Sequence, residues 1–483
     1  MRVLVTGATG FVGRALIPLL QREGHSVLAW VRSEASARSL LGADVELIPT
    51  AKDVGALVTT TERCDAVVNL AGAPLLGGRW TRTRRQVLED SRVQVTSGLV
   101  QAIGKARTRP RVLISGSAVG YYGDRDDESL TEASSAGADY LAGLCGRWED
   151  AAQQAEALGV RVVRLRTGVV LGREGGAIAQ MRLPFALGLG GPIGSGRQYF
   201  PWVHLHDLVN IVARALTDQR YRGPINGVAP EHATSRAFAQ AFGHALHRPA
   251  LLPVPALALR AIFGESAIML LASQRVAPRT LEQLGFGFAF PNLDAALRDI
   301  AGSDAVTISA ARSRRRDIRA ARYELRTRTV VDAPLQQTFA FFSDAANLGL
   351  ITPAAMKFTI QGAVPAITTG AEINYRLRIG PLPMRWRTRI VAWEPSRRFV
   401  DCQEAGPYRL WWHEHRFDAD GTLTVIEDRV YYAPPFGILG RLAHRLFISG
   451  MLKRIFQYRH DVIRLRFGTA HSTRVLPPHD ETP

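Results

Sequence analysis

Cysteine is scarce in this chain, with three residues among 483. They stand far apart, at Cys64, Cys145 and Cys402, so their spacing fits neither a disulfide framework nor a zinc site. We therefore expect no disulfide bond and no metal site. No apolar run is long enough to span a bilayer, and the first residues enter a strand directly rather than a secretory signal. The expected setting is cytoplasmic, without stable membrane insertion.

Acidic residues are also in deficit, since 60 Lys and Arg against 43 Asp and Glu give a net charge of +17. Such an excess is typical of proteins that bind nucleic acid. The arginines are dispersed, however, with one dense cluster at 312–316, and no recognition motif accompanies them. We expect no nucleic-acid partner. The length exceeds what one ordinary core accommodates, so more than one domain is expected.

The first 32 residues carry the most specific pattern in the chain. A short apolar run, Val3–Thr6, meets a Gly-x-x-Gly-x-x-Gly turn, and an amphipathic stretch leads to a second apolar run, Ser26–Val31. This order indicates a strand, a phosphate-binding turn, a helix and a strand, in which the helix N-terminus offers free N–H groups to a diphosphate. The residues expected to contact a dinucleotide are Gly7, Thr9, Gly10, Phe11, Val12 and Gly13.

The residues after the second apolar run bear on which dinucleotide binds. A carboxylate there would hydrogen-bond a ribose 2′-hydroxyl, whereas an arginine accommodates a 2′-phosphate. The run is followed by Arg32, and the first carboxylate comes at Glu34. Arg32 therefore favours NADP(H) as the cofactor.

Short apolar runs alternate with helical stretches through the first half of the chain. The further runs lie at 45–48, 66–70, 111–115 and 161–165. This alternation predicts an α/β fold of Rossmann type, with a doubly wound parallel sheet. We place this domain at residues 1–300, of which 250–300 form the C-terminal segment, and a linker at 301–321.

The pattern changes at residue 322, where strands rich in Arg, Trp and Tyr begin and a long amphipathic helix follows them. This order predicts an α+β domain at 322–468, with the helix lying on a curved antiparallel sheet. A disordered tail is expected at 469–483. An apolar pocket is expected between helix and sheet, and its candidate lining residues are Trp386, Trp411, Trp412, Phe417, Leu446 and Phe456.

The second half offers one group of residues suited to acid–base work. Glu414 stands between His413 and His415. Neighbouring positions on a strand face opposite sides of the sheet, so we expect no catalytic cluster there.

Several segments of the first half resemble extended short-chain dehydrogenases/reductases. Three of them are Asn69–Gly72, Ile114–Ala118 and the Val-His-x-x-Asp segment at 203–207. More closely, Ser117–Gly123 and Cys145–Glu149 resemble the NAD-dependent epimerase-like subfamily, some of whose members are labelled cell-division inhibitors. The resemblance covers about residues 1–300. It implies that three further residues contact the cofactor, namely Leu70, Ala71 and Gly72.

The same resemblance implies a catalytic pair. In the wider family a serine and a tyrosine flank the substrate, and a lysine four residues after the tyrosine lowers its pKa. Ser117 and Tyr140 match the serine and the tyrosine, but the lysine position holds Leu144. Either the tyrosine is activated differently, with positive charge from Arg92 or Arg147, or the reaction is not standard hydride chemistry.

The substrate pocket implied by the resemblance includes Tyr121 and His204. Tyr121 and its neighbour Tyr122 are alternative acid–base residues to Tyr140. Asp207 follows His204 in the Val-His-x-x-Asp segment, where a carboxylate equally suits a helix cap.

The second half resembles START-like helix-grip domains of the SRPBCC, polyketide-cyclase type. The segments that carry this resemblance are Val331–Pro334, Trp393–Pro395, Gly406–Tyr408 and the terminal helix. It implies a lipid or polyketide-like ligand, although this fold hosts many functions. Three functions stay open: an NADP(H)-dependent oxidoreductase or epimerase for an unidentified small molecule, a dinucleotide-binding sensor or regulator without catalysis, and an apolar-ligand carrier regulated by the first half.

Overall fold

The computed structural model describes residues 1–50, 54–75, 78–173, 175–302, 306–312, 316–379 and 382–468. The chain divides into two compact units. The first contains residues 1–34 and 45–301, and the second contains residues 35–44 and those from 302 onward. The tail at 469–483, predicted to be disordered, lies outside the described residues.

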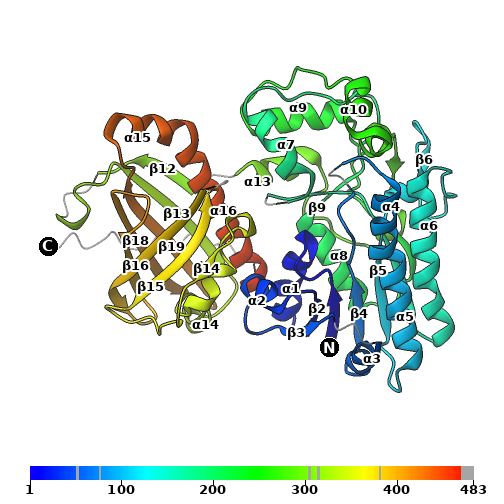
Figure 1. Cartoon of the computed structure of the whole chain (residues 1–483), viewed down its shortest axis with the longest axis horizontal. Coiled ribbons are helices and arrows are strands. Elements are labelled where there is room, and N and C mark those ends of the chain that lie inside the picture. Colours follow the sequence, from blue (N-terminus) through cyan, green and yellow to red (C-terminus); the bar gives the residue numbers. More distant parts are fainter. Residues whose placement is uncertain are drawn as a thin grey trace. The chain divides into compact units, whose positions relative to one another are not determined.

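A seven-stranded, fully parallel sheet forms the centre of the first unit (Figure 1). In spatial order its strands are β3 (Glu46–Pro49), β2 (Ser26–Val31), β1 (Arg2–Thr6), β4 (Ala66–Asn69), β5 (Val112–Ala118), β7 (Arg161–Thr167) and β10 (Gly223–Gly227). The strand order reverses between β1 and β4, and dinucleotides bind at this switch point in sheets of the Rossmann type. The predicted parallel sheet is confirmed.

Helices lie on both sides of this sheet, which is why its strands are apolar on both faces. The helices of this unit are α1 (Phe11–Arg22), α3 (Val54–Glu62), α4 (Arg82–Glu89), α5 (Val95–Lys105), α6 (Tyr140–Gln153), α7 (Gly176–Ala186), α8 (Leu205–Thr217), α9 (Ser235–Ala245), α10 (Ala256–Phe263), α11 (Ile268–Leu271), α12 (Arg279–Gln283) and α13 (Leu293–Gly302). Helix α1 packs against α8, whereas α5 packs against α3 and α6. Two small sheets pair β6 (Ser129–Leu130) with β11 (Arg275–Val276), and β8 (Val169–Leu171) with β9 (Trp202–His204).

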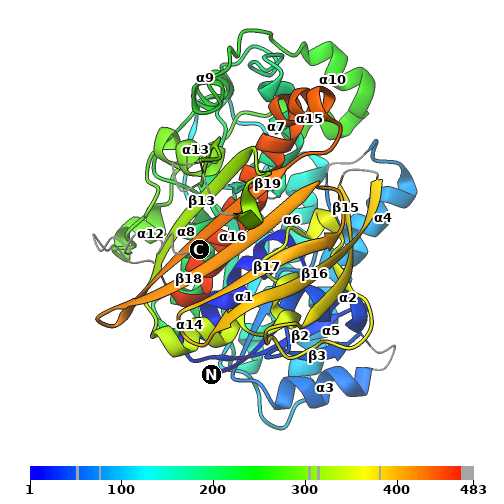
Figure 2. The same cartoon turned by 90° about the vertical axis from the view of Figure 1, so that its left-hand side faces the viewer.

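The second unit is built on an eight-stranded antiparallel sheet (Figure 2). In spatial order its strands are β12 (Val306–Ala310), β13 (Tyr323–Val331), β19 (Leu423–Ala433), β18 (Leu410–Asp420), β17 (Arg398–Ala405), β16 (Leu382–Glu394), β15 (Glu372–Ile379) and β14 (Thr359–Ile360). Its helices are α14 (Leu335–Phe342), α15 (Gly437–Ala443) and α16 (Ser449–Phe467), and residues 35–44 add most of α2 (Glu34–Leu41). Helix α16 buries Leu452, Phe456, Ile463 and Phe467 against the sheet. An antiparallel sheet with a long closing helix was expected here and is present.

One strand occupies part of the segment predicted to be a linker. Residues 306–310 form β12, which pairs antiparallel with β13 at the edge of the second sheet. Val306 and Ile308 supply its apolar positions and pack on the domain core. The strand has only five residues and lies close to an arginine-rich stretch, so its alternation is too short to stand out in the sequence.

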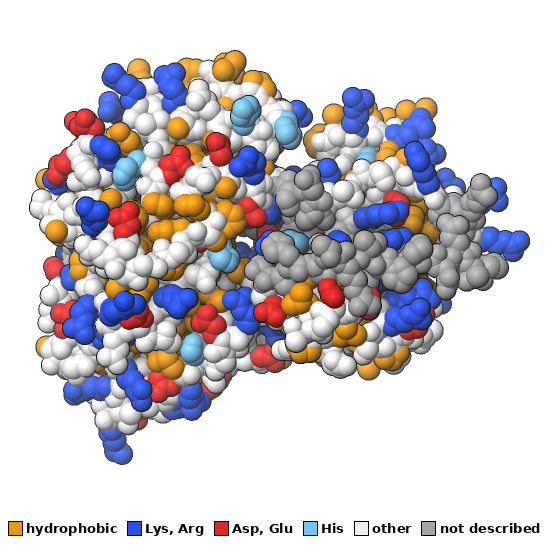
Figure 3. All heavy atoms as spheres, turned by 180° about the vertical axis from the view of Figure 1, so that it is seen from behind, with side chains coloured by type: hydrophobic (Ala, Val, Ile, Leu, Met, Phe, Trp, Pro, Cys, Tyr) orange, Lys and Arg blue, Asp and Glu red, His pale blue; other side chains and the backbone are white. Residues whose placement is uncertain are grey.

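The described helices contain none with both the length and the apolar composition needed to cross a bilayer. On the face of the first unit seen in Figure 3, basic side chains are scattered and interspersed with acidic ones.

Candidate functional site

The turn between β1 and α1 brings two stretches of backbone very close together. Gly7 has a φ of +65°, and a Cβ added to it would lie 2.5 Å from the carbonyl oxygen of Leu70. A Cβ on Gly13 would lie 2.5 Å from the carbonyl oxygen of Gly7. Both positions therefore require glycine. The N–H of Gly10 donates to the Gly7 carbonyl at 2.9 Å and closes the turn.

The N-terminus of α1 presents N–H groups that no side chain among the described residues caps. Gly10 is the capping residue, and the first turn of the helix holds no acidic residue. Thr9 and Gly10 are exposed, while Phe11 and Val12 are half-buried. A diphosphate fits this end of the helix because its charge meets unpaired N–H groups and the positive end of the helix dipole.

Residues Leu70–Gly72 are held beside this turn through Thr6. The Thr6 hydroxyl donates to Oδ1 of Asn69 at 2.6 Å and accepts the N–H of Ala71 at 3.2 Å. Arg32 is exposed and directly follows β2, the strand next to β1. The residues predicted to hold the cofactor therefore come from the carboxyl ends of three neighbouring strands.

Arg92 is buried next to the same edge and lies in one π-helical turn, Asp90–Gln94. Its guanidinium donates to the carbonyl oxygens of Leu88 at 3.2 Å and Ala73 at 2.9 Å, and a Cβ on Gly72 would lie 3.2 Å from its Nη2. Burial lowers the pKa of Arg92. Within the described residues no carboxylate lies at ion-pair distance from it. Such π-turns are frequent at functional sites.

Ser117 is buried at the end of β5, and its hydroxyl donates to a Glu149 oxygen at 2.7 Å. Arg166 on β7 holds the same carboxylate through two nitrogens, at 2.8 and 2.9 Å. Its Nη1 donates to the Tyr122 hydroxyl at 3.0 Å. A paired guanidinium fixes a carboxylate in orientation, so Glu149 in turn fixes the Ser117 hydroxyl.

No role for Glu149 or Arg166 was predicted from the sequence. The sequence does contain a signal for this ion pair. Arg166 lies within a strand that helices cover on both faces, and a buried arginine there needs a buried anion. Nothing local in the sequence, however, says that the anion comes from α6.

Tyr140 is the first residue of α6 and is half-buried. Its hydroxyl lies 3.4 Å from the backbone carbonyl of Arg85, and the Arg85 guanidinium lies 4.7 Å from the ring centre. Burial and the nearby Glu89 raise the pKa of Tyr140. Leu144, at the family's lysine position, is 1% exposed among apolar side chains. The catalytic roles of Ser117 and Tyr140 remain predictions.

The two residues expected in the substrate pocket have packing partners in the structure. The Arg166 guanidinium lies 3.5 Å above the ring centre of Tyr121. His204 is buried, accepts a backbone N–H in the first turn of α8 and lies tilted against Phe290, with the ring centres 3.9 Å apart. Asp207 accepts the backbone N–H groups of Phe290 and the residue before it, at 3.0 and 2.8 Å. Contact of Tyr121 and His204 with a substrate stays a prediction.

The second unit contains a partly open cavity of about 150 Å³ between its sheet, α14 and α16. Three of the predicted lining residues line it, namely Trp386, Trp411 and Phe456. Three do not: Trp412 and Phe417 lie in separate apolar clusters, and Leu446 is 60% exposed. For Trp412 the reason is alternation, because its neighbour Trp411 faces the cavity.

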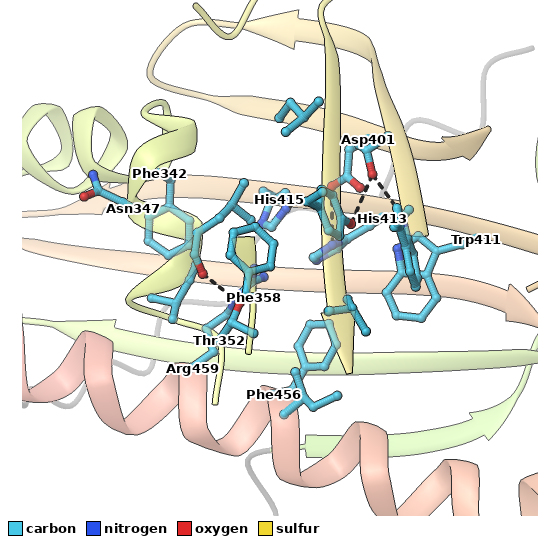
Figure 4. A pocket seen from close by; sticks show the side chains of 18 of the residues that line it. Phe342, Asn347, Thr352, Phe358, Asp401, Trp411, His413, His415, Phe456 and Arg459 are labelled. Carbon is cyan, nitrogen blue, oxygen red and sulfur yellow. Dashed lines mark hydrogen bonds and ion pairs between the residues drawn. The ribbon is translucent and has the colours of Figure 1, made fainter. Parts of the chain in front are cut away.

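A polar cluster lies on the cavity wall, formed by Asp401, His413 and His415 (Figure 4). Glu414 is not part of this cluster, as strand alternation predicted, whereas the meeting of the two histidines with Asp401 was not foreseen. Glu414 does face the other side, where it pairs with Arg398 at 3.1 Å. The two histidines are two residues apart, however, so they share one side of the sheet and meet the aspartate of the neighbouring strand.

The parallel sheet, the glycine turn at its switch point and the uncapped helix define the first unit as a Rossmann-type dinucleotide-binding domain. The model of the NAD dependent epimerase/dehydratase family matches residues 3–226, and that of a domain of unknown function, DUF1731, matches residues 254–300. Because residues of this chain also match nearly the whole of human SDR39U1, the chain belongs to the epimerase family that includes SDR39U1.

Similar proteins occur in animals and plants. The human "Epimerase family protein SDR39U1" is 42% identical over 304 residues, which cover 62% of this chain and 99% of the relative. The chloroplastic homolog of Arabidopsis thaliana is 43% identical over 310 residues, which cover 62% of this chain and 86% of the relative. A crystal structure of the human protein with NADPH has a TM-score of 0.56 and 41% identity, and covers 62% of this chain and 99% of that one. NADP(H), the cofactor expected here, is thus the ligand of that relative.

Proposed function

We propose that the first unit is an NADP(H)-dependent oxidoreductase or epimerase that acts on a small molecule at the carboxyl ends of β4 and β5. The observation that carries the proposal is the glycine turn, in which Gly7 and Gly13 leave no room for a Cβ beside an uncapped helix N-terminus. The NADPH complex of the human relative supports the choice of dinucleotide.

The residues of this chain divide into a cofactor group and a substrate group. The N–H groups at the start of α1 bind the diphosphate, and Arg32 pairs with the 2′-phosphate. The bound nicotinamide supplies or accepts a hydride. Ser117 and Tyr140 take the substrate side, and the buried charge of Arg92 attracts an anionic part of the substrate.

The protonation of Tyr140 bears on the direction of the reaction. Because burial and Glu89 raise its pKa, the phenol holds its proton at neutral pH and serves as an acid rather than as a base. It can then donate that proton from Oη to a carbonyl oxygen that is being reduced. The hydroxyl of Ser117 donates its proton to Glu149, so its lone pairs are left to accept a hydrogen bond from the hydroxyl group of the reduced product.

The test is substrate-dependent oxidation of NADPH by the full chain over panels of carbonyl compounds and nucleotide sugars. Tyr140→Phe is expected to lower turnover about 100-fold or more, because it removes the acid, and Ser117→Ala is expected to impair it as well. Ser129→Ala, at an exposed position on β6, is the matched control and keeps full turnover. Turnover that survives both site variants would contradict the assigned roles.

The second candidate function is a dinucleotide-binding sensor or regulator. Leu144 favours it, because this buried side chain leaves Tyr140 without the ammonium that the wider short-chain dehydrogenase/reductase family places beside its tyrosine. A sensor binds NADPH with the same pocket but shows no turnover with either panel. Calorimetry with NADPH and the turnover assay together separate the two functions.

For the second unit we propose a START-like domain, at about residues 322–468, that binds an apolar ligand. The aromatic and aliphatic lining of its cavity supports this. Native mass spectrometry of the freshly purified chain should detect a co-purified lipid or polyketide-like molecule, which mild organic extraction removes. A chain that carries none and binds none from a lipid extract would end the proposal. That the protein acts in the cytoplasm remains a prediction.

A further inference from the structure

Four ionisable side chains from three neighbouring strands meet on one face of the second sheet. Asp401 on β17 is paired in register with His413 on β18, and His415 on β18 is paired with Asp428 on β19. The side chains of His413, His415 and Asp428 are 6% exposed or less, and that of Asp401 is 15% exposed. Burying this many ionisable groups costs free energy unless they pair with one another or bind a common ligand.

The side of the cluster towards the cavity has the dimensions of a metal site. Oδ2 of Asp401 lies 3.4 Å from Nδ1 of His413 and 3.3 Å from Nε2 of His415. One donor atom from each of the three residues lies within 4.8 Å of the others. Two atoms that bind one ion at about 2.1 Å in tetrahedral geometry are about 3.4 Å apart. All three residues line the cavity (Figure 4).

The far side of the cluster has the carboxylate that metal-binding histidines usually have behind them. Oδ1 of Asp428 lies 3.3 Å from Nε2 of His413 and 2.6 Å from Nδ1 of His415, which are the ring nitrogens turned away from Asp401. Asp428 is held in turn by the Thr327 hydroxyl at 3.0 Å, and Nη1 of Arg459 lies 3.6 Å from it. A carboxylate on the second nitrogen fixes the tautomer and the ring orientation of a histidine ligand.

We propose that Asp401, His413 and His415 bind one divalent transition-metal ion in the wall of the second unit's cavity. Two imidazoles and one carboxylate suit Zn²⁺ or Fe²⁺ better than Mg²⁺ or Ca²⁺, which prefer oxygen donors. Three protein ligands leave a coordination position free, as in catalytic metal sites. That position faces the cavity, where an oxygen atom of a bound apolar molecule, or a water, completes the shell.

Charge in the cluster is consistent with a bound cation. Metal-bound histidines are neutral, so the two carboxylates and Arg459 leave one net negative charge in the wall of an apolar cavity. A divalent cation offsets that charge. The competing explanation is a cluster held together by protons alone, and it predicts no metal affinity.

The experiment is a titration of the tag-free, metal-stripped full chain with Co²⁺, followed by visible absorption and by tryptophan fluorescence. The ring of Trp411 lies 6.3 Å from that of His413, so Co²⁺ at the site should quench its emission. We expect saturable binding of one Co²⁺ per chain, which Zn²⁺ displaces. Elemental analysis of the unstripped chain should show the metal that the cell supplies.

Four variants test which residues bind the metal ion. His413→Gln and Asp401→Asn are expected to abolish stoichiometric binding, whereas Asp428→Asn should weaken it about 10–100-fold, because it removes only the carboxylate behind the rings. His444→Gln, at a buried histidine that does not line the cavity, is the matched control and should bind as the unaltered chain does. Near-ultraviolet circular dichroism shows whether each variant keeps the tertiary packing of the aromatic residues.

The outcomes are distinct. Binding that is lost in folded His413→Gln and kept in His444→Gln supports the site. Absence of saturable binding to the unaltered chain, or binding that His413→Gln leaves intact, overturns it. Neither result depends on NADPH, so the proposed function of the first unit is tested separately.

Discussion

The hydroxyl of Ser117 and the carboxylate of Glu149 form a hydrogen bond of 2.7 Å between two buried side chains. Arg166 holds the same carboxylate, so β5, α6 and β7 are tied together directly beneath the candidate catalytic serine. Charge-assisted bonds of this kind are about twice as strong as neutral ones. The position of the Ser117 hydroxyl therefore depends on an ion pair that lies behind it.

Replacing Glu149 with Gln tests this dependence. The substitution keeps the shape but leaves the Arg166 guanidinium, 3% exposed, without its anion. Breaking a buried pair from one side costs about 3–5 kcal/mol. We expect a loss of this size in the free energy of unfolding, measured by urea denaturation. Glu156→Gln, at an exposed position just after α6, should stay within about 0.5 kcal/mol. Equal stability of the two variants would mean that the pair does not hold this part of the sheet.

Arg32 should set the preference between the two dinucleotides. Its guanidinium can hydrogen-bond a 2′-phosphate, and bonds to a charged group contribute about 1.5–3 kcal/mol. Arg32→Ala is therefore expected to weaken NADPH binding by about 10–100-fold and to leave NADH binding unchanged, as measured by calorimetry. Arg22→Ala, an exposed charge at the end of α1, controls for the general effect of charge. Equal affinity of the unaltered chain for NADPH and NADH would exclude this role of Arg32.

The parallel sheet and the cofactor turn could be predicted because their signals are local. The run Val3–Thr6 and the glycines after it lie within a dozen residues, and Gly10 and Gly13 avoid contacts with the backbone of the turn itself. The Glu149–Arg166 pair could not be predicted in the same way. Its members are 17 residues apart and meet only because α6 packs beside β7.

In the second unit, too, features within one strand could be predicted from the sequence and contacts between strands could not. The strand pattern correctly separated Glu414 from its neighbours, because alternation is a property of one strand. The meeting of His413 with Asp401 depends on the register between two strands. The register between two strands is set by the packing of the whole sheet, so the local sequence around His413 or Asp401 does not reveal it.

Protonation of His444 should weaken the second unit in acid. Its ring stacks on Tyr323 at 3.5 Å and its Nε2 lies 2.8 Å from the Tyr432 hydroxyl, and burial lowers its pKa below the ordinary 6.5. The unfolded chain then takes up the proton first, so this residue's contribution is present above about pH 6.5 and declines as the pH falls. We expect the stability difference between the unaltered chain and His444→Gln to be larger at pH 8 than at pH 5, by urea denaturation. A difference that grows towards pH 5 would contradict the sign.

Leu144 decides whether the missing lysine can be restored. It is 1% exposed and packs with Trp80, Leu88 and Leu141, so its site is apolar on all sides. A lysine there would bury an ammonium without a partner, and we expect Leu144→Lys to lower the free energy of unfolding by about 3 kcal/mol or more. Leu144→Met, which conserves volume, should cost less than about 1.5 kcal/mol. If Leu144→Lys instead unfolds like the unaltered chain and oxidises NADPH faster with a carbonyl substrate, the ammonium reaches Tyr140, and the position is catalytic rather than part of the core.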